Sequence, residues 1–298
     1  MRIAVTGVTG FVGGAVCRAA TAAGWHVHPL GRREWNIDDG PLPGPPRVDA
    51  VVHCAAAVND WGPPGPTWRT NLEGTRHVAA TFPAVRLVHI SSASVYDPFR
   101  PTVQAREDEA PVARYLTAYA ASKAAAERLL ADRPDTVVLR PHAVYGPGDR
   151  VLLPRILSAV RGRTLWIVGD GRARQSLTSI DNLVAAALRA CAPDAPPGVY
   201  NVADAAPVTV GAALGELMRA LGRDVRIRGL PLRPAWRAAG AFEAAWRLAR
   251  RPGPPRLTRY AISHLGLERT LDLGAARARL GLDPAPTSFE GAAGWLGG

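Results

Sequence analysis

The chain has 298 residues, of which 47% are hydrophobic and 20% are charged, the balance of an ordinary globular protein. A chain of this length exceeds the usual size of a single core, so we expect one large α/β unit with a smaller second lobe. The formal net charge is +11, but the arginines are scattered without a long basic run. This pattern favours a genome rich in arginine codons and argues against a nucleic-acid partner.

The three cysteines, Cys17, Cys54 and Cys191, stand far apart among apolar residues. We expect buried free thiols in a reducing compartment, with no disulfide and no metal site. No signal peptide precedes the first predicted strand, and no uncharged run approaches 18 residues. We therefore expect a cytoplasmic protein without a transmembrane segment.

A predicted strand over residues 2–6 runs directly into a glycine-rich turn and then into a helix that extends to about residue 23. Glycine gives a tight turn that lets a ligand approach the backbone, and a helix N-terminus favours a phosphate group. This order is typical of a dinucleotide-binding site, although a plain turn is the alternative at this point. The residues expected to contact the cofactor here are Thr6, Gly7, Thr9, Gly10, Phe11, Val12 and Gly13.

The second predicted strand, residues 25–30, ends in Gly31, Arg32 and Arg33. An acidic residue at this strand end would bind the adenosine ribose and favour NAD, whereas two arginines suit the 2′-phosphate of NADP. A solvated arginine pair is the alternative. Asp38 follows, where a contact with the adenine is expected. Residues 40–46 are rich in Pro and Gly, which predicts that this part of the sheet is abbreviated.

Two further predicted strands end in small or hydroxyl-bearing residues. Residues 50–57 form a buried strand that empties into a small-residue turn, where Cys54, Ala55 and Ala56 would let a cofactor lie against the backbone. Residues 86–90 form the next strand, which ends at Ser91 and Ser92. Ligands of open α/β sheets bind at the carboxyl ends of the strands, so these residues are expected to face the ligand.

Lys123 is the only lysine in the chain. Arginine cannot replace lysine where a compact ammonium group is needed at short range. Tyr119 lies four residues earlier on the same predicted helix, which spans residues 114–130, so the two side chains share one face. A nearby ammonium group favours the phenolate and would lower the pKa of Tyr119, which indicates a proton donor that works near neutral pH. An exposed pair formed by chance is the alternative.

Beyond a strand over residues 136–140, the chain leaves the predicted sheet at a Pro/Gly cluster and returns for a helix after residue 178 and a strand at residues 199–202. A later amphipathic helix, residues 234–250, carries Trp236, Phe242 and Trp246 together with several arginines. Three interpretations stand for these aromatic residues: core packing, the roof of a pocket, or contact with a membrane surface.

The motifs, taken in order, resemble the extended short-chain dehydrogenase/reductase superfamily. They are Thr6-Gly7-x-x-Gly10-x-x-Gly13, His53-x-Ala55-Ala56, Asn71-x-x-Gly74-Thr75, Ser91-Ser92-Ala93, Tyr119-x-x-x-Lys123 and Arg140-Pro141-x-x-Val144-Tyr145-Gly146-Pro147. The resemblance implies a catalytic triad of Ser92, Tyr119 and Lys123, in which Tyr119 exchanges the proton and Ser92 holds the substrate oxygen. Lys123 would bind the nicotinamide ribose. The resemblance also implies cofactor contacts at Asn71, Pro141 and Val144.

Within that superfamily, enzymes acting on nucleotide sugars usually carry Asn at the position of Ala143 and an Arg-Asp pair at Gln175-Ser176. This chain has neither and is more similar to the 3β-hydroxysteroid dehydrogenase-like branch, for example at Thr178-x-Ile180-Asp181-Asn182. The resemblance implies a nicotinamide-dependent oxidoreductase acting on a ketone or secondary alcohol of a hydrophobic substrate: sterol-like, polyketide-like or branched acyl. The arginine pair after the second strand favours NADP as its cofactor. A nucleotide-sugar epimerase, dehydratase or 4-ketoreductase is the alternative. A redox sensor that keeps the fold without the chemistry is disfavoured because the Tyr-Lys pair is intact.

The expected fold is a Rossmann-type, doubly wound parallel sheet with a smaller, mainly helical C-terminal substrate lobe. Residues 1–145, with 178–203 returning to them, would form the NAD(P)-binding domain. Residues 146–177 and 204–298 would form the substrate lobe. A homodimer through the alanine-rich helix of Tyr119 is a further expectation, and the basic surface would suit an acidic acyl carrier.

Overall fold

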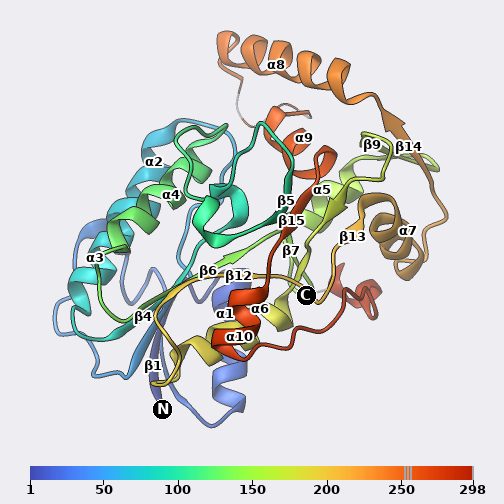
Figure 1. Ribbon diagram of the computed structural model, residues 1–298. Helices are drawn as coiled ribbons and strands as arrows, with labels where there is room; N and C mark the ends of the chain where they lie inside the picture. The colour runs from blue at the N-terminus through green and yellow to red at the C-terminus, as the bar shows by residue number, and fades with distance from the viewer. Residues whose placement is uncertain (252, 254, 256, 297–298) are drawn as a thin grey trace.

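The computed structural model describes residues 1–251, 253, 255 and 257–296. Its centre is a six-stranded sheet in which every neighbouring pair is parallel, in the order β12-β6-β4-β3-β1-β2 (Figure 1). The strands are β1 (Arg2–Thr6), β2 (His26–Leu30), β3 (Ala50–His53), β4 (Arg86–Ile90), β6 (Thr136–Pro141) and β12 (Gly198–Val202). The predicted Rossmann-type sheet is therefore confirmed.

Helices cover both faces of this sheet, which explains why its strands are apolar runs rather than alternating patterns. Ile3 and Val5 pack on the side of α1 (Phe11–Ala22) and α6 (Ile180–Cys191). Ala4, between them, points to the other side, which is covered by α3 (Gly74–Thr81) and α4 (Ala118–Leu130). Successive residues of β1 thus serve two cores.

The sheet is shortened beside β2, as the sequence predicts. Residues 31–49, all of them described, form no further strand and contain only the short helix η1 (Ile37–Asp39). Trp35 and Ile37 are nevertheless buried against the sheet, and the Trp35 indole nitrogen donates to Gly40 O at 2.9 Å. Where a further strand and helix would cover the sheet, this segment covers it with the buried side chains of Trp35 and Ile37.

Helix α4 starts later than predicted, at Ala118 rather than near residue 114. The Thr117 hydroxyl accepts a hydrogen bond from Ala120 N at 3.2 Å, so Thr117 is the N-cap. Tyr119 consequently lies in the first turn of the helix, close to the end of the sheet where ligands bind.

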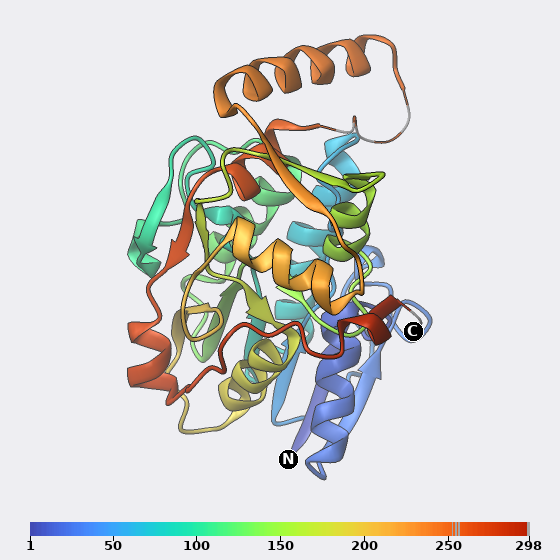
Figure 2. The same ribbon diagram turned by 90° about the vertical axis from the view of Figure 1, so that its right-hand side faces the viewer.

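The chain after residue 145 builds a second core around Leu165, Leu214 and Met218. Most of its long elements are helices, but short strands link them into small sheets. Figure 2 shows that α8, the predicted amphipathic helix, lies along one end of the molecule. The division of the chain at residues 145 and 146 stays a prediction.

The remaining helices and strands are α2 (Pro64–Trp68), α5 (Leu152–Ser158), α7 (Val210–Ala220), α8 (Leu232–Leu248), α9 (Arg259–Gly266), α10 (Gly274–Leu280), β5 (Thr102–Ala105), β7 (Val144–Tyr145), β8 (Val160–Arg161), β9 (Thr164–Val168), β10 (Arg174–Gln175), β11 (Thr178–Ser179), β13 (Val208–Thr209), β14 (Arg226–Leu230) and β15 (Arg269–Leu271).

Candidate active site

Tyr119, Lys123 and Glu127 follow one another at four-residue intervals along one face of α4. Lys123 is buried, and its Nζ donates to Ile90 O, the last carbonyl of β4, at 2.6 Å. This bond fixes the helix to the strand end from which Ser91 and Ser92 emerge. The lone lysine of the sequence is therefore a buried group held at the carboxyl edge of the sheet.

The two serines after β4 have different environments. Ser91 is buried, and its hydroxyl donates to the Glu127 carboxylate. Ser92 is half-buried, its Oγ accepts from Ser94 N at 3.1 Å, and its hydroxyl lies near enough to the Tyr119 phenol to lower the pKa of that group. Of the two serines, Ser92 is the one that affects the pKa of Tyr119, and its catalytic role stays a prediction.

The expectation that Lys123 lowers the pKa of Tyr119 is wrong for this structure. Burial raises the pKa of Tyr119, and the hydrogen bond to Ser92 offsets only part of that rise. Burial also lowers the pKa of Lys123 to about 8. The reason is that both groups are desolvated at once, which disfavours the charged form of each. Near pH 7 the phenol keeps its proton and is therefore a proton donor.

Close backbone contacts in the turn after β1 require glycine at two positions. A Cβ on Gly7, whose φ is +69°, would lie 2.7 Å from Ala55 N, and a Cβ on Gly13 would lie 2.3 Å from Gly7 O. Gly10, by contrast, is exposed and is the N-cap of α1. Gly7 and Gly13 thus bring strand, turn and helix together, and Gly10 leaves the helix N-terminus accessible to an anion. Thr9 is exposed beside it, and Phe11 and Val12 are half-buried.

Two further polar residues predicted to contact the cofactor, Asp38 and Asn71, have different environments. Asp38 Oδ2 accepts from the Thr70 hydroxyl at 3.1 Å, whereas its buried Oδ1 has no partner in the described part of the chain. That unpaired acceptor suits an exocyclic amine such as that of adenine. Asn71 lies in the π-helical turn η2 (Arg69–Glu73). Its Nδ2 donates to Ala57 O at 3.2 Å and to Ser122 Oγ at 2.9 Å.

The end of β3 has the small, half-buried surface expected for cofactor packing, formed by Cys54, Ala55 and Ala56. Thr6 is different, because it is fully buried and its hydroxyl contacts His53 Nδ1 at 2.7 Å and accepts from Ala55 N at 3.2 Å. Thr6 therefore positions the β3 turn. At the end of β6, Pro141 is buried and Val144 is half-buried beside Thr178.

Arg32 and Arg33 are exposed after β2. The sequence reasoning missed Glu34, whose Oε2 accepts from Gly31 N at 2.9 Å. A Cβ on Gly31 would also lie 3.3 Å from Val8 Cγ2, so this carboxylate is close to the glycine turn. The position beside the predicted ribose site thus carries both positive and negative side chains.

An aromatic wall near Tyr119 joins His142, which follows β6, to Tyr260 and His264 of α9, and no local sequence pattern predicts it. The His142 and His264 rings stack with centroids 5.6 Å apart, and Tyr260 packs on His264 at 4.2 Å. Burial raises the pKa of Tyr260, and the negative charge of a Tyr119 phenolate raises it further, so the two tyrosines are near each other. Burial lowers the pKa of His142 to about 4 and that of His264 well below its usual value. The wall is therefore uncharged near pH 7.

The positions that would hold a sugar-nucleotide diphosphate are occupied by structural contacts. The Gln175 amide donates to Leu267 O at 2.8 Å, and Ser176 Oγ accepts from Leu271 N at 3.0 Å. Both side chains are buried. Ala143 has a φ of +47°, in the left-handed region that Asn tolerates better than Ala.

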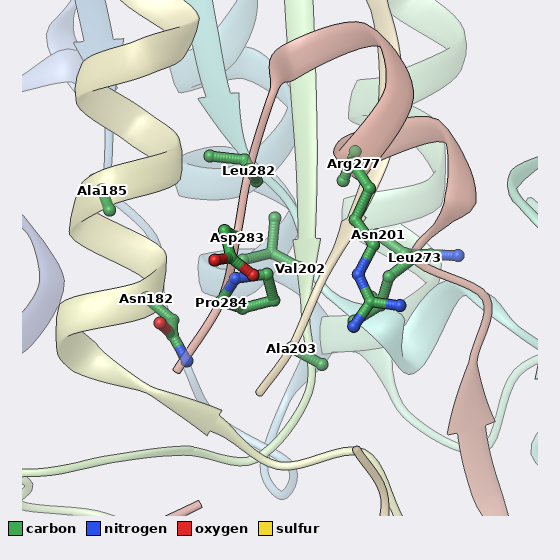
Figure 3. A pocket seen from close by; sticks show the side chains of 11 residues that line it. Asn182, Ala185, Asn201, Val202, Ala203, Leu273, Arg277, Leu282, Asp283 and Pro284 are labelled. Atoms are coloured by element: carbon green, nitrogen blue, oxygen red, sulfur yellow. The ribbon is translucent and has the colours of Figure 1, made fainter. Parts of the chain in front are cut away.

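The cavity in Figure 3 is a separate feature. It has a volume of about 50 Å³ and lies between α6, β12 and α10, with Asn182, Asn201 and Arg277 on its walls. It contains none of Ser92, Tyr119 and Lys123.

Among the described residues, no three or more His, Cys, Asp or Glu side chains are grouped to hold a metal ion. The three cysteines are free, with Cys191 buried and the other two half-buried.

Residues 3–203 match the NAD dependent epimerase/dehydratase family. A 2-alkyl-3-oxoalkanoate reductase from Stenotrophomonas maltophilia is 32% identical, over 98% of this chain and 97% of that protein. A 4-hydroxy-2-methyl-3-oxo-4-farnesyl-3,4-dihydroquinoline-1-oxide ketoreductase from Stigmatella aurantiaca is 30% identical, over 98% and 94%. Among solved structures, MoeE5 in complex with UDP-glucose and NAD has a TM-score of 0.72 at 23% identity, covering 99% of this chain and 97% of that one.

Fold, glycine turn and reductase relatives together define a nicotinamide-dependent dehydrogenase/reductase of the extended short-chain type. The chain belongs to the NAD-dependent epimerase/dehydratase family. No helix in the described part of the chain is both long and apolar enough to cross a membrane.

Proposed function

We propose that this enzyme transfers a hydride between NADP(H) and a ketone or secondary alcohol on a hydrophobic substrate. The observation that carries the proposal is the wall of His142, His264 and Tyr260 beside Tyr119. The His142 and His264 rings are stacked, the Tyr260 ring is tilted on His264, and the lowered pKa values of both histidines keep them uncharged near pH 7. The rings themselves favour an apolar body, and the two nearby positive side chains are already engaged, Arg155 by Asp60 and Arg269 by backbone carbonyls.

The catalytic roles that we assign are supported by the surroundings of Ser92, Tyr119 and Lys123. The bound nicotinamide supplies or accepts the hydride. Ser92 Oγ and the Tyr119 phenol, which lie near each other, would hold one substrate oxygen between them. Tyr119 keeps its proton near pH 7 and donates it to that oxygen when a ketone is reduced. Lys123, fixed by Ile90 O, is placed to hold the nicotinamide ribose.

The substrate class is narrowed by the relatives. The reductase from Stenotrophomonas maltophilia is named for a 2-alkyl-3-oxoalkanoate, a branched acyl chain with a 3-oxo group. Gln175 and Ser176 are buried in structural contacts, so the usual diphosphate ligands of nucleotide-sugar enzymes have no counterpart. We therefore favour a 3-oxo acyl substrate over a sterol-like or polyketide-like one. A nucleotide-sugar epimerase or 4-ketoreductase is the second candidate, favoured by the fold of MoeE5.

A substrate panel tests this choice. NADPH oxidation should be measured with 2-alkyl-3-oxo acids of increasing chain length beside UDP- and dTDP-4-keto sugars. We expect kcat/KM to rise with chain length for the apolar ketones and to stay at background for the nucleotide sugars. Turnover of the nucleotide sugars alone would overturn the proposal in favour of the second candidate.

The preference for NADP(H) depends on Arg32 and Arg33. A well-formed arginine-phosphate bond contributes about 1.5–3 kcal/mol, so Arg32→Ala/Arg33→Ala should weaken NADPH binding far more than NADH binding. Glu34→Gln is the matched variant and should strengthen NADPH binding, because it removes a negative charge near Gly31. A wild-type preference for NADH, or equal losses for the two cofactors in the double variant, would contradict the assignment.

The homodimer through α4, the acyl-carrier partner and the cytoplasmic location stay predictions.

A further inference from the structure

Helix α8 presents an apolar face to solvent. In Figures 1 and 2 it lies along one end of the molecule, and its outer side meets no other part of the drawn ribbon. Phe242 is 54% exposed and Leu248 is 88% exposed. Successive residues of a helix are turned by 100° about its axis. On one arc of about 120° of the α8 circumference, every exposed residue is apolar. They are Pro234, Ala238, Ala241, Phe242, Ala245, Leu248 and Ala249.

The opposite side of α8 packs against the rest of the protein. Ala235 and Ala239 are buried against Ile262 of α9, and Trp236 is partly buried in the same cluster. Glu243, the single acidic residue of the helix, is buried, and its carboxylate accepts from Arg259 N at 2.7 Å and from Arg259 Nε at 2.9 Å. The outer apolar face is therefore not a core face exposed through loose packing.

The charge around this face has one sign. Arg233 and Arg237 flank the apolar arc on one side, and Arg250 and Arg251 follow its C-terminal end; all four are exposed. No acidic residue is exposed on α8, because Glu243 is buried. This combination of an apolar face with arginine flanks is the pattern of a helix that lies in the interfacial region of a bilayer.

A groove lies under the N-terminal half of the helix, on its inner side, separated from the apolar arc by Arg233 and Arg237. It has a volume of about 230 Å³, with Phe99, Leu232, Trp236 and Leu267 on its walls and Arg233 and Arg237 at its edge. Phe99 itself is 43% exposed. An acyl chain would meet apolar side chains here while an anionic head group would meet guanidinium groups. The groove is therefore a separate feature, and the docking face is the outer arc alone.

We propose that the outer face of α8 docks on the surface of an anionic phospholipid bilayer, with Phe242 and Leu248 in the interfacial layer and the arginines on the lipid phosphates. A second copy of the chain is a poorer occupant. Pairing two α8 helices would bring two arginine rows together between chains that each carry a net charge of +11. The proposal does not depend on the proposed substrate, since it concerns a face outside the catalytic groups.

Vesicle flotation with the full chain tests this inference. The probes are vesicles of phosphatidylcholine alone and of phosphatidylcholine with about 30% phosphatidylglycerol, at low salt and at 0.5 M NaCl. We expect the chain to float with the anionic vesicles at low salt, with weaker binding at high salt because the charges are screened. Phe242→Ser/Leu248→Ser should weaken binding by on the order of tenfold. Arg233→Glu/Arg237→Glu should weaken it by at least fivefold for each arginine.

Matched controls separate a local surface from general basicity. Val103 on β5 is 63% exposed, so Val103→Ser controls for loss of an exposed apolar side chain. Arg219→Glu/Arg223→Glu at the end of α7 changes the net charge by the same amount on exposed residues elsewhere. Unchanged thermal melting would show that every variant is folded. Equal losses in the α7 controls, or absence of anionic-vesicle binding by the wild type, would overturn the proposal. So would a dimer, seen by sedimentation velocity, that the α8 variants dissociate.

Discussion

Glu127 of α4 and Arg140 of β6 form an ion pair that is almost completely removed from solvent. Arg140 Nη2 lies 2.7 Å from Glu127 Oε2, and the two side chains are 1% and 4% exposed, respectively. The same carboxylate accepts from the Ser91 hydroxyl, and Arg140 also donates to Tyr96 Oη at 3.2 Å. The pair therefore ties the helix of Tyr119 and Lys123 to the ends of β4 and β6.

Replacing one member of this pair should destabilise the fold strongly. Glu127→Gln leaves the Arg140 charge buried without a counter-ion, so we expect the free energy of unfolding to fall by about 3 kcal/mol. Urea denaturation measures this change. As a control, Arg163→Ala breaks the exposed ion pair with Asp224, which is about 80% solvent-exposed on both sides, and should leave the midpoint nearly unchanged. Similar urea midpoints for the two variants would show that the buried pair contributes no more to stability than the exposed one.

Tyr119→Phe should abolish turnover while leaving cofactor binding almost intact. The variant keeps the ring in the first turn of α4 but removes the proton that the reaction needs, which is worth roughly 10²–10⁴ in rate. Stopped-flow measurement of hydride transfer and fluorescence titration of NADPH separate the two effects. Ser92→Ala should also reduce turnover, because Ser92 lies beside the same phenol and lowers its pKa. Wild-type turnover in Tyr119→Phe would remove this residue from the mechanism.

Lys123→Met should stabilise the protein, and the gain should depend on pH. Burial lowers the pKa of Lys123 to about 8, whereas the group has an ordinary pKa of 10.5 when unfolded. The unfolded chain therefore binds more protons between these pH values, so wild-type stability rises with pH across that window. We expect a gain for Lys123→Met on the order of 1 kcal/mol below pH 8, which shrinks toward pH 10.5. A gain that is constant from pH 6 to 10 would contradict this origin.

The left-handed residue Ala143 offers a test of why this chain lacks the asparagine of nucleotide-sugar enzymes. Its φ of +47° is strained for Ala, so Ala143→Asn and Ala143→Gly should each raise stability by about 0.5–1 kcal/mol. Thermal unfolding measures the effect. Ala143→Asn should gain no activity on nucleotide sugars, because Gln175 and Ser176 remain engaged with Leu267 and Leu271. The appearance of such activity would show that one side chain decides the substrate class.

The sheet and the Tyr119-Lys123 pair could be predicted from the sequence because their determinants are local. A strand followed by spaced glycines specifies the first unit, and four-residue spacing on a helix places two side chains on one face. Glu34 was missed because its role depends on a side chain that folds back onto Gly31. The His142-His264 contact joins residues 122 positions apart, and no local pattern encodes such a meeting. The pKa of Tyr119 was predicted in the wrong direction because burial is a property of the whole fold.

The most direct test of the central claim is the transfer of deuterium from NADPH labelled at C4 of the nicotinamide. The wild type should be incubated with a 2-alkyl-3-oxo acid, and the product should be analysed by mass spectrometry and NMR. We predict one deuterium at C3 of a 3-hydroxy product, delivered to one face only, and none from Tyr119→Phe. A product without deuterium, or no reaction except with nucleotide sugars, would contradict the assignment of this site as an NADPH-dependent reductase of apolar ketones.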